Sequence, residues 1–369
     1  MSASHADRLA EAVAAEELDQ LIVADLVNPG DSGREAQADV FWLCGFTGTS
    51  GICLVGPEER SFLTDFRYTE RAEREVDASF DRIRLEGRMM PELAKRLRGR
   101  VGYDDARTSV RSLGKLKEAT GSEVELVAVE ALTGGLRRRK DAEEVRRIAA
   151  AAALADQVYE WLCEEGLTGR SEREVQLAAE GHMRELGAQD PAFPAIVAAG
   201  ENAALPHHEA SAREIGPNEL VIIDMGAIVD GYCSDCTRTF ATGEVPEEAA
   251  AVYELVRSSQ AAALGAVGPG VSGKDADAVS REPIAAAGYS DHYGHGLGHG
   301  VGIEVHEPPR LSRRYEGEPD VLEPGDVVTV EPGVYLPGRF GVRIEDLVTI
   351  TEDGIRNLSS VGKELRIVG

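Results

Sequence analysis

The sequence has few cysteines, little lysine and no long apolar run. Among its 369 residues there are only 5 cysteines, an odd number at scattered positions, which argues against the disulfide framework of a small secreted protein. No apolar stretch approaches the roughly 20 residues that a membrane-spanning helix needs, and the polar, acidic N-terminus lacks the apolar core of a signal peptide. We therefore expect a cytoplasmic protein.

Positive charge is also scarce. The 39 lysines and arginines stand against 65 aspartates and glutamates, which gives a formal net charge of -26. Such a surface repels phosphate groups, so the composition argues against nucleic-acid partners and against anionic membranes. An excess of carboxylate with scarce lysine would suit a halophile-like, salt-rich cytoplasm, because salt screens the self-repulsion of the chain.

The length of the chain predicts two domains, and the first shows alternating strand and helix patterns. It begins with an acidic amphipathic helix within residues 1–20, and a turn is expected at Asn28-Pro29-Gly30. The expected strands cover residues 20–24, 50–55, 61–64, 80–85, 101–103 and 124–127, and the expected helices cover 68–77, 91–98 and 107–119. We predict a first domain over residues 1–132.

A basic island, Leu136-Arg-Arg-Arg-Lys140, follows this region, and we interpret it as a solvated connector rather than an anion site. Ser171 and Glu174 have the spacing of a capping box, which predicts the start of a helix. The expected helices cover residues 141–165, 171–186, 247–265 and 273–287, with strands in the remainder. We predict a second domain over residues 133–369, and an α/β (α+β) fold overall.

Two acidic residues mark a hairpin in the second domain. Asp224 ends an apolar strand, Asp230-Gly231 is a hairpin turn signal, and Asp235 lies on the return strand. A two-residue turn places Asp224 and Asp235 directly opposite each other or one diagonal step apart. Their side chains share one face of the sheet in either case.

A second acidic pair fits the same argument. Val327–Glu331 and Val342–Asp346, joined through residues 336–339, form a predicted hairpin that pairs Glu331 with Glu345. These acids could simply face water, but Asp224 and Glu331 each end a Val/Ile run typical of a buried strand. Two carboxylates on one buried face destabilise a sheet unless a positive charge balances them.

A glycine-rich segment, residues 294–302, contains His295 and His299. It does not fit the dinucleotide pattern G-x-G-x-x-G, and its glycines exclude the helix of a zincin motif, so an extended strand beside a cleft fits better. With His299 the four carboxylates could balance two divalent cations. Oxygen-rich ligation with one nitrogen favours Mn²⁺, Co²⁺ or Fe²⁺ over a thiolate-bound structural zinc. The one CxxC, Cys233 and Cys236, lies in a predicted strand where residues three apart face opposite sides, which argues against a shared metal.

Five segments of the second domain together resemble the creatinase/aminopeptidase family of dinuclear metallopeptidases, the pita-bread fold. They are Phe193-Pro-Ala-Ile-Val197 with Ala204-Leu-Pro-His-His208, Val221–Arg238, Gly294–Pro309, Val327–Tyr335 and Gly341–Asp346. In the first domain, Leu43-Cys-Gly-Phe-Thr47 and Leu63-Thr-Asp-Phe-Arg-Tyr68 resemble the N-terminal domain of the proline-specific members. The resemblance implies a creatinase-like α/β domain followed by a pita-bread catalytic domain, as in Xaa-Pro aminopeptidases and Xaa-Pro dipeptidases (prolidases).

The resemblance also implies a role for each residue of the site. The implied metal ligands are Asp224, Asp235, His299, Glu331 and Glu345. His207 matches a residue that contacts the substrate or leaving group, His306 one that steadies the scissile carbonyl, and His295 one that lines the pocket. Arg343 matches an orienting group, and Arg310 stands where some prolidases hold the substrate carboxylate, although a surface arginine is an equal alternative. His208 occupies a position that more often holds glycine.

The implied activity is hydrolysis of Xaa-Pro peptide bonds by a metal-bridging hydroxide, with Glu331 as the proton shuttle. Two Mn²⁺ or Co²⁺ ions are expected, with Zn²⁺ or Fe²⁺ as alternatives, and the family suggests a homodimer that acts on proline-containing peptides. The cleavage mode, aminopeptidase or dipeptidase, depends on whether the cleft closes behind the proline. One rival reading is a metal-retaining non-peptidase, such as a creatinase-like C–N hydrolase. Another is a catalytically dead binding module like those of histone chaperones.

Overall fold

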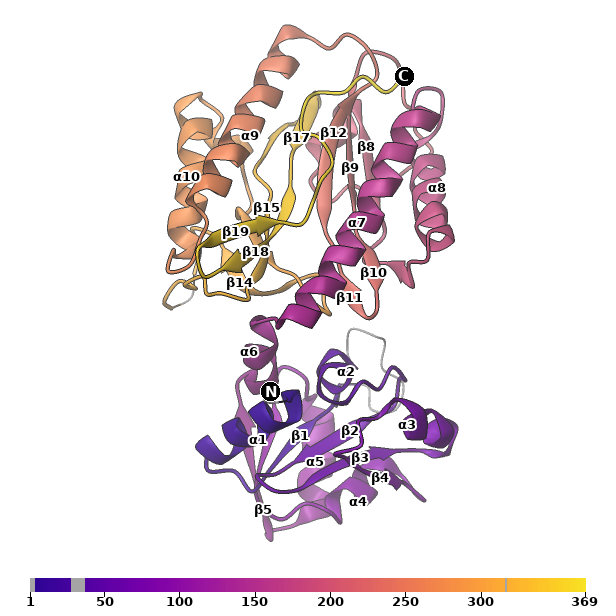
Figure 1. Ribbon diagram of the computed structural model, residues 1–369, viewed down its shortest axis with the longest axis vertical. Coiled ribbons are helices and arrows are strands. Elements are labelled where there is room, and N and C mark those ends of the chain that lie inside the picture. Colours follow the sequence, from indigo (N-terminus) through magenta and orange to yellow (C-terminus); the bar gives the residue numbers. More distant parts are fainter. Residues whose placement is uncertain (1–3, 28–36, 316) are drawn as a thin grey trace. The chain divides into compact units, whose positions relative to one another are not determined.

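The computed structural model describes residues 4–27, 37–315 and 317–369, and the chain forms two compact units, Met1–Arg137 and Arg138–Gly369 (Figure 1). The turn expected at Asn28-Pro29-Gly30 lies outside the described residues. None of the described helices has the length and apolar character that a membrane crossing requires.

The first unit contains one six-stranded mixed sheet in the order β4-β3-β2-β1-β5-β6. Strands β1, β5 and β6 run parallel, whereas β2 is antiparallel to both of its neighbours. The strands are β1 (Gln20–Val23), β2 (Ile52–Val55), β3 (Arg60–Thr64), β4 (Asp81–Arg84), β5 (Gly99–Asp104) and β6 (Val124–Val129). The helices are α1 (His5–Ala15), α2 (Ala38–Cys44), η2 (Phe66–Tyr68), α3 (Thr69–Glu75), α4 (Met89–Ala94), α5 (Val110–Thr120) and α6 (Leu132–Arg138).

All six strands expected in this unit are present, because each combines an apolar run with turn residues at its ends. Two short helices, α2 and α6, are not predicted by the sequence pattern. Helix α2 is only 7 residues long, and its N-cap residue Gln37 makes no side-chain capping hydrogen bond. Nearly all of its residues are buried, so it lacks the polar face by which an amphipathic helix is recognised.

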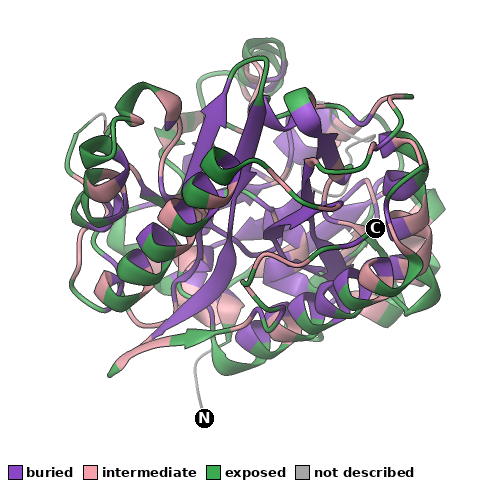
Figure 2. Cartoon of the chain, turned by 90° about the horizontal axis from the view of Figure 1, so that it is seen from above, coloured by how far each residue is buried: buried purple, intermediate pink, exposed green. Residues whose placement is uncertain are grey.

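The second unit has a core of four small sheets covered by long helices (Figures 1 and 2). The helices are α7 (Ala142–Glu165), α8 (Glu172–Glu185), η3 (Gly200–Ala204), α9 (Glu247–Ala266), α10 (Gly273–Ala286) and η4 (Ser290–His292). The sheets, in strand order, are β11-β10-β7, β12-β9-β8, β14-β13-β15-β18-β19 and β16-β17. Figure 2 shows most of the strands as a buried layer and the outer faces of the helices as exposed.

The strands of this unit are short. Their bounds are β7 (Asp190–Pro191), β8 (Ile196–Ala199), β9 (Leu220–Met225), β10 (Ala227–Val229), β11 (Tyr232–Cys233), β12 (Cys236–Ala241), β13 (Gly298–Gly300), β14 (Glu307–Leu311), β15 (Val327–Val330), β16 (Gly333–Leu336), β17 (Phe340–Arg343), β18 (Asp346–Thr351) and β19 (Gly354–Asn357). The four long helices lie where the sequence predicts them. The capping box at Ser171 and Glu174 is confirmed, with both of its reciprocal hydrogen bonds present.

The basic island is not the solvated connector that we expected. Arg138 forms a bidentate ion pair with the fully buried Asp326. Lys140 places its Nζ 3.0 Å from Glu307 Oε2, and both side chains are almost completely buried. Arg138 and Lys140 therefore belong to the interior contacts of the second unit. Composition alone missed this, because the acidic partners lie more than 160 positions away along the chain.

Candidate metal centre

The first acidic hairpin has the register that its turn predicts. Asp230 and Gly231 both have positive φ, 47° and 84°, as a two-residue hairpin turn requires. Asp224 is opposite Thr237, so Asp235 lies one diagonal step away, between β11 and β12. The diagonal arrangement is therefore the one present.

The second acidic pair has the register that we expected, in which Glu331 lies opposite Glu345, but the ladder of the hairpin is interrupted at this point. Strand β15 pairs with β18, where Val330 is opposite Asp346, while β16 pairs with β17, where Gly333 is opposite Arg343. Glu331 and Glu345 occupy the gap between these two ladders. Pro332 explains the interruption, because proline has no N–H for a ladder hydrogen bond.

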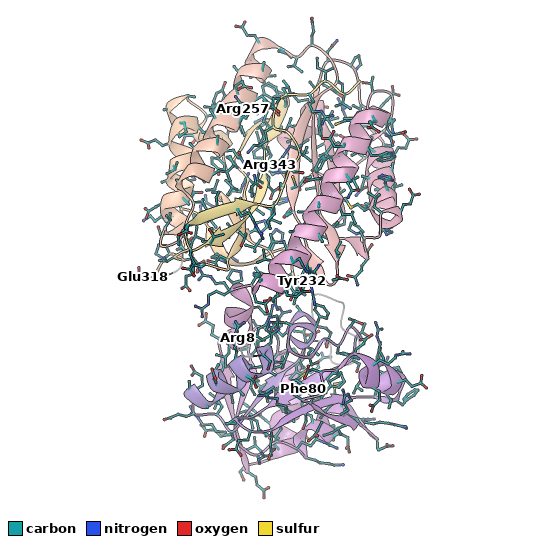
Figure 3. All side chains as sticks on the ribbon, viewed as in Figure 1. Arg8, Phe80, Tyr232, Arg257, Glu318 and Arg343 are labelled. Atoms are coloured by element: carbon teal, nitrogen blue, oxygen red, sulfur yellow. The ribbon has the colours of Figure 1, made fainter. Side chains whose placement is uncertain are left out.

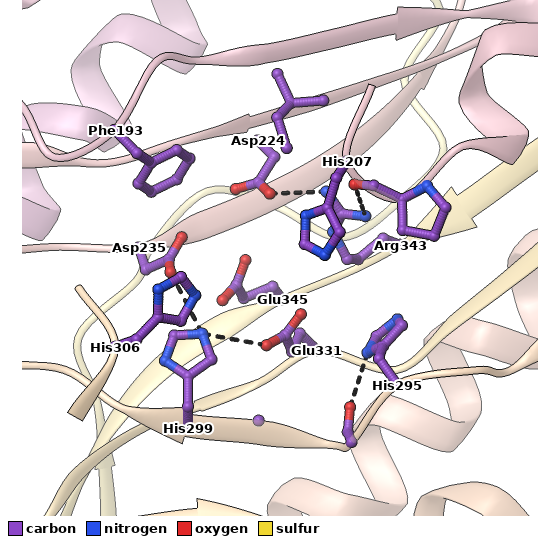
Figure 4. A pocket seen from close by; sticks show the side chains of 14 residues that line it. Phe193, His207, Asp224, Asp235, His295, His299, His306, Glu331, Arg343 and Glu345 are labelled. Atoms are coloured by element: carbon purple, nitrogen blue, oxygen red, sulfur yellow. Dashed lines mark hydrogen bonds and ion pairs between the residues drawn. The ribbon is translucent and has the colours of Figure 1, made fainter. Parts of the chain in front are cut away.

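Acidic side chains from both places converge on one cavity of about 380 Å³ (Figure 4). Asp224, Asp235 and Glu345 each contribute a carboxylate oxygen to a group in which all the oxygens lie within 4.8 Å of one another. His299 Nε2 lies 3.4 Å from Glu331 Oε1 and 3.7 Å from Asp235 Oδ2. All five predicted metal ligands therefore line the same cavity.

Burial and mutual repulsion disfavour negative charge in this cluster. Burial, reinforced by the neighbouring carboxylates, raises the pKa values of Asp235 and Glu345 well above their usual range. Burial also raises the pKa of Glu331 to about 8. Burial, together with the nearby His306, lowers the pKa of His299 to about 4, so its imidazole is neutral at pH 7 and suited to bind a cation.

The donor set fits divalent cations. Asp224 Oδ2 accepts a hydrogen bond of 2.7 Å from Arg343 Nη2, but its Oδ1 atom is buried without a hydrogen-bond partner among the described residues. An unpartnered carboxylate oxygen is costly in a protein interior, and a cation would satisfy it. Carboxylate oxygens with one imidazole nitrogen are the ligands that hard and borderline divalent ions prefer.

The other predicted site residues are His207, His295, His306, Arg343 and Arg310, and all but Arg310 line this cavity. Figure 3 shows Arg343 within the second unit, and its Nη1 lies 2.9 Å from the hydroxyl of Tyr335. The same hydroxyl lies 2.9 Å from His295 Nε2. His207 and His306 are both exposed, so they stand at the rim.

Arg310 lies elsewhere. It is exposed and lines a separate hollow of about 440 Å³ together with Arg314, Tyr315 and Asp320. Its Cα pairs across the β13–β14 ladder with that of His299, so the two side chains leave the same face of the sheet. The Sγ atoms of Cys233 and Cys236 contact different carbonyl oxygens, those of Ile303 and Glu345, so the two thiols do not face a common site.

Several buried polar residues that hold the site together were not predicted. Arg238 is fully buried in β12, and its guanidinium donates to the Glu345 carbonyl and to Asp346 Oδ1. The hydroxyl of Tyr159 lies 3.0 Å from the Ile223 carbonyl oxygen and 2.6 Å from that of Cys236, which ties β9 to β12. Arg238 lies between two threonines in a strand that follows a hairpin turn, and a lone charge in such a strand is a signal that could have indicated it.

A buried set of carboxylates beside a neutral imidazole is a donor set that suits a metal-dependent hydrolase. Residues 146–352 match the model of metallopeptidase family M24, and residues 6–138 match the Creatinase/Prolidase N-terminal domain. The chain therefore belongs to metallopeptidase family M24.

Relatives and solved structures agree with this assignment. The chain is 39% identical over 337 residues, which cover 90% of it and 94% of the relative, to the uncharacterized peptidase YqhT of Bacillus subtilis. The structure of an Xaa-Pro dipeptidase from Bacillus anthracis matches with a TM-score of 0.91 and 34% identity over 99% of both chains. An X-Pro aminopeptidase from Thermotoga maritima matches with a TM-score of 0.87 and 32% identity over 97% of this chain and all of the other.

Proposed function

We propose that the protein hydrolyses Xaa-Pro peptide bonds with two divalent cations held by Asp224, Asp235, His299, Glu331 and Glu345. The convergence of the Asp224, Asp235 and Glu345 oxygens within 4.8 Å, with one Asp224 oxygen left unpartnered, carries this proposal. Two matching structures support the substrate class, since one is named an Xaa-Pro dipeptidase and the other an X-Pro aminopeptidase.

Several finer points belong to the same proposal. We expect Mn²⁺ or Co²⁺ in the site, a homodimer in a salt-rich cytoplasm, and functional domains over residues 1–132 and 133–369. When bound, the cations supply Lewis acidity for the substrate carbonyl and lower the pKa of water.

The side chains of the cavity have separate roles in the proposed reaction. His306 donates a hydrogen bond to the oxyanion that develops on the scissile carbonyl. The Glu331 carboxylate takes a proton from the attacking water and passes it to the prolyl nitrogen, which becomes the leaving amine. His207 contacts the substrate from the exposed rim. Arg343 orients Asp224 through the hydrogen bond to Oδ2.

The cavity wall suits a proline ring. Phe193, Ile196 and Pro206 give it an apolar side. Because a prolyl amide has no N–H donor, recognition of the ring must rest on shape and apolar contact rather than on a hydrogen bond to that nitrogen.

Arg310 decides the length of the peptide in this proposal. A guanidinium binds a carboxylate bidentately, so an arginine beyond the prolyl subsite would favour the free C-terminus of a dipeptide. Arg310 shares the face of His299 but lines the neighbouring hollow. We therefore expect Arg310→Ala to raise KM for an Xaa-Pro dipeptide more than for an Xaa-Pro-Xaa tripeptide if the enzyme is a dipeptidase.

The test is proline release from both peptides by protein loaded with Mn²⁺ or Co²⁺ in high salt, with the bound metal measured. Asp235→Ala serves as the inactive variant. Asp353→Ala serves as the matched control, since Asp353 is an exposed carboxylate in the β18–β19 turn. We expect metal-dependent cleavage by the wild type and by Asp353→Ala, and none by Asp235→Ala.

Cleavage of the dipeptide alone assigns the enzyme as a prolidase, and cleavage of the tripeptide assigns it as an aminopeptidase. Metal-loaded protein that cleaves neither peptide contradicts the proposal and favours a non-peptidase C–N hydrolase. Asp235→Ala that keeps both metal and activity removes this residue from the ligand set.

A further inference from the structure

The segment that carries His207 is irregular and contributes to the rim of the cavity. It runs from the end of β8 at Ala199 through η3 to Ser211. His207 itself is exposed, and so is the preceding Leu205, at 54%. Packing of its own side chains therefore does not fix this part of the segment, and something else must hold it.

One buried carboxylate accepts hydrogen bonds from several residues of this segment. Glu172, the first residue of α8, is fully buried. Its Oε1 accepts hydrogen bonds from Ala199 N at 2.9 Å and from Asn202 Nδ2 at 3.0 Å. Its Oε2 accepts from His208 Nε2 at 2.8 Å, from Ser211 N at 3.1 Å and from Ser211 Oγ at 2.6 Å. Every one of these donors belongs to residues 199–211.

The Glu172 carboxylate is ionised in this setting. Burial acts to raise its pKa, but the hydrogen bonds, led by that from the Ser211 side chain, outweigh burial and leave the pKa below its usual value. Its place in the first turn of α8 favours a negative charge as well, since the N-terminus of a helix carries partial positive charge. Five hydrogen bonds to one carboxylate fix the positions of the donors, because each donor must keep its geometry toward one of two oxygen atoms.

The opposite side of the segment is held by Arg343, which also binds Asp224. The Pro206 carbonyl accepts a hydrogen bond of 3.3 Å from Arg343 Nη1, and Nη2 of the same guanidinium donates to Asp224. Close packing adds to this, because a Cβ on Gly341 of β17 would lie 2.0 Å from the Ala203 carbonyl oxygen. His207 therefore lies between two anchors, Glu172 on one side and Arg343 on the other.

We propose that Glu172, together with His208, is a positioning residue that holds His207 in place for the substrate. This inference rests on the role proposed above for His207, and it adds a residue that touches neither substrate nor metal. His208 belongs to the proposal because its Nε2 donates to Glu172 Oε2, directly beside His207 in the chain.

The experiment compares Glu172→Gln, His208→Leu and His208→Gln. Glutamine at 172 keeps the size of the side chain but turns one acceptor into a donor that faces the His208 and Ser211 donors. Glutamine at 208 restores a donor near the place of Nε2, whereas leucine cannot donate. Asp156→Asn is the matched control, since Asp156 is another buried carboxylate, and it accepts from Ser360 rather than from the His207 segment.

Two measurements decide the outcome. Hydrogen exchange of residues 199–211 in the metal-free protein should quicken in Glu172→Gln and His208→Leu but not in His208→Gln or Asp156→Asn. In the metal-loaded enzyme, kcat/KM for an Xaa-Pro peptide should fall by about tenfold to a hundredfold in Glu172→Gln, mainly through a higher KM. His208→Leu should show a smaller fall of the same kind, which His208→Gln reverses.

The proposal is overturned if exchange of residues 199–211 does not change, or if Glu172→Gln and Asp156→Asn alter the kinetics alike. Should Glu172→Gln fail to fold, the leucine and glutamine variants of His208 decide alone. The exchange data do not depend on activity. A wild type that cleaves no Xaa-Pro bond would therefore count against the proposed function and leave the positioning of the segment to be judged by exchange.

Discussion

The two units of the chain use charge differently. In the first unit, ion pairs such as Arg98–Glu59 have side chains that are 58% and 67% exposed. In the second unit, the pair of Arg238 with Asp346 is only 2% and 1% exposed. The first unit has a buried pair as well, Arg137 with Asp39. In the second unit, however, several charged residues with little exposure contact the segments that line the cavity.

The difference indicates what buried charge is for in this protein. An exposed pair contributes roughly 0–1 kcal/mol, and a buried pair often contributes no more than an apolar pair of equal size would. Stability alone therefore does not explain why the second unit buries so many charges. Arg238 holds the Glu345 peptide, Arg281 holds the carbonyl of His295, and Glu172 holds the His207 segment. Arg238 and Glu172 are buried and Arg281 is largely buried, and each of the three holds a segment that lines the cavity.

The largest expected effect comes from a carboxylate of the cavity. Glu345→Gln keeps the volume of the side chain but removes a negative charge from the proposed metal site, so activity should fall by at least about a hundredfold. The matched change in the first unit, Asp7→Asn, alters an exposed carboxylate and should leave activity unchanged. Steady-state kinetics and metal content test this. Equal activity in both variants would contradict the contrast between the units.

An intermediate effect is expected from the buried pair behind the cavity. Arg238→Met leaves Asp346 buried with Lys363 as its remaining cation. The free energy of unfolding should fall by about 3–5 kcal/mol. Arg98→Met, at the exposed pair of the first unit, should cost less than about 1 kcal/mol. Denaturant unfolding of the metal-free proteins measures both, and similar losses would show that burial does not distinguish the two pairs.

The smallest effect is a local change of pKa in the first unit. Hydrogen bonds from Arg60 and Ser4 lower the pKa of Asp7 from 3.8 to about 2. Because the folded pKa is the lower one, the stabilisation is present above pH 3.8 and is lost as the pH falls toward 2. Arg60→Met should raise the pKa of Asp7 toward 3.8, as an NMR titration would show. An unchanged titration would mean that Ser4 alone sets this pKa.

Local signals predicted much of this molecule, and long-range contacts account for most of the rest. The Asp230-Gly231 turn fixes the register of its hairpin, so the placement of Asp224 and Asp235 on one face could be predicted from the twelve residues 224–235. Glu331 and Glu345 were rightly placed near each other, but the effect of Pro332 on the ladder was overlooked.

Glu172 and Lys140 could not be predicted as buried anchors, because each looks like an ordinary charged residue at the start of a helix. Their partners, such as His208 and Glu307, lie 36 and 167 positions away. Only the folded chain brings such pairs together. The structure places the five proposed ligands around one cavity. The chemical roles of these residues remain predictions, which the experiments above test.

The Asp230-Gly231 turn also limits which insertions this sequence can accept during evolution. Insertion of one residue there would turn Asp235 to the other face of its strand, because side chains alternate along a strand. An insertion in the Glu352-Asp353 turn, by contrast, would move none of the five proposed ligands, since all of them precede it in the chain. Among descendants of this protein, the β10–β11 loop should therefore keep its length while the β18–β19 turn varies freely.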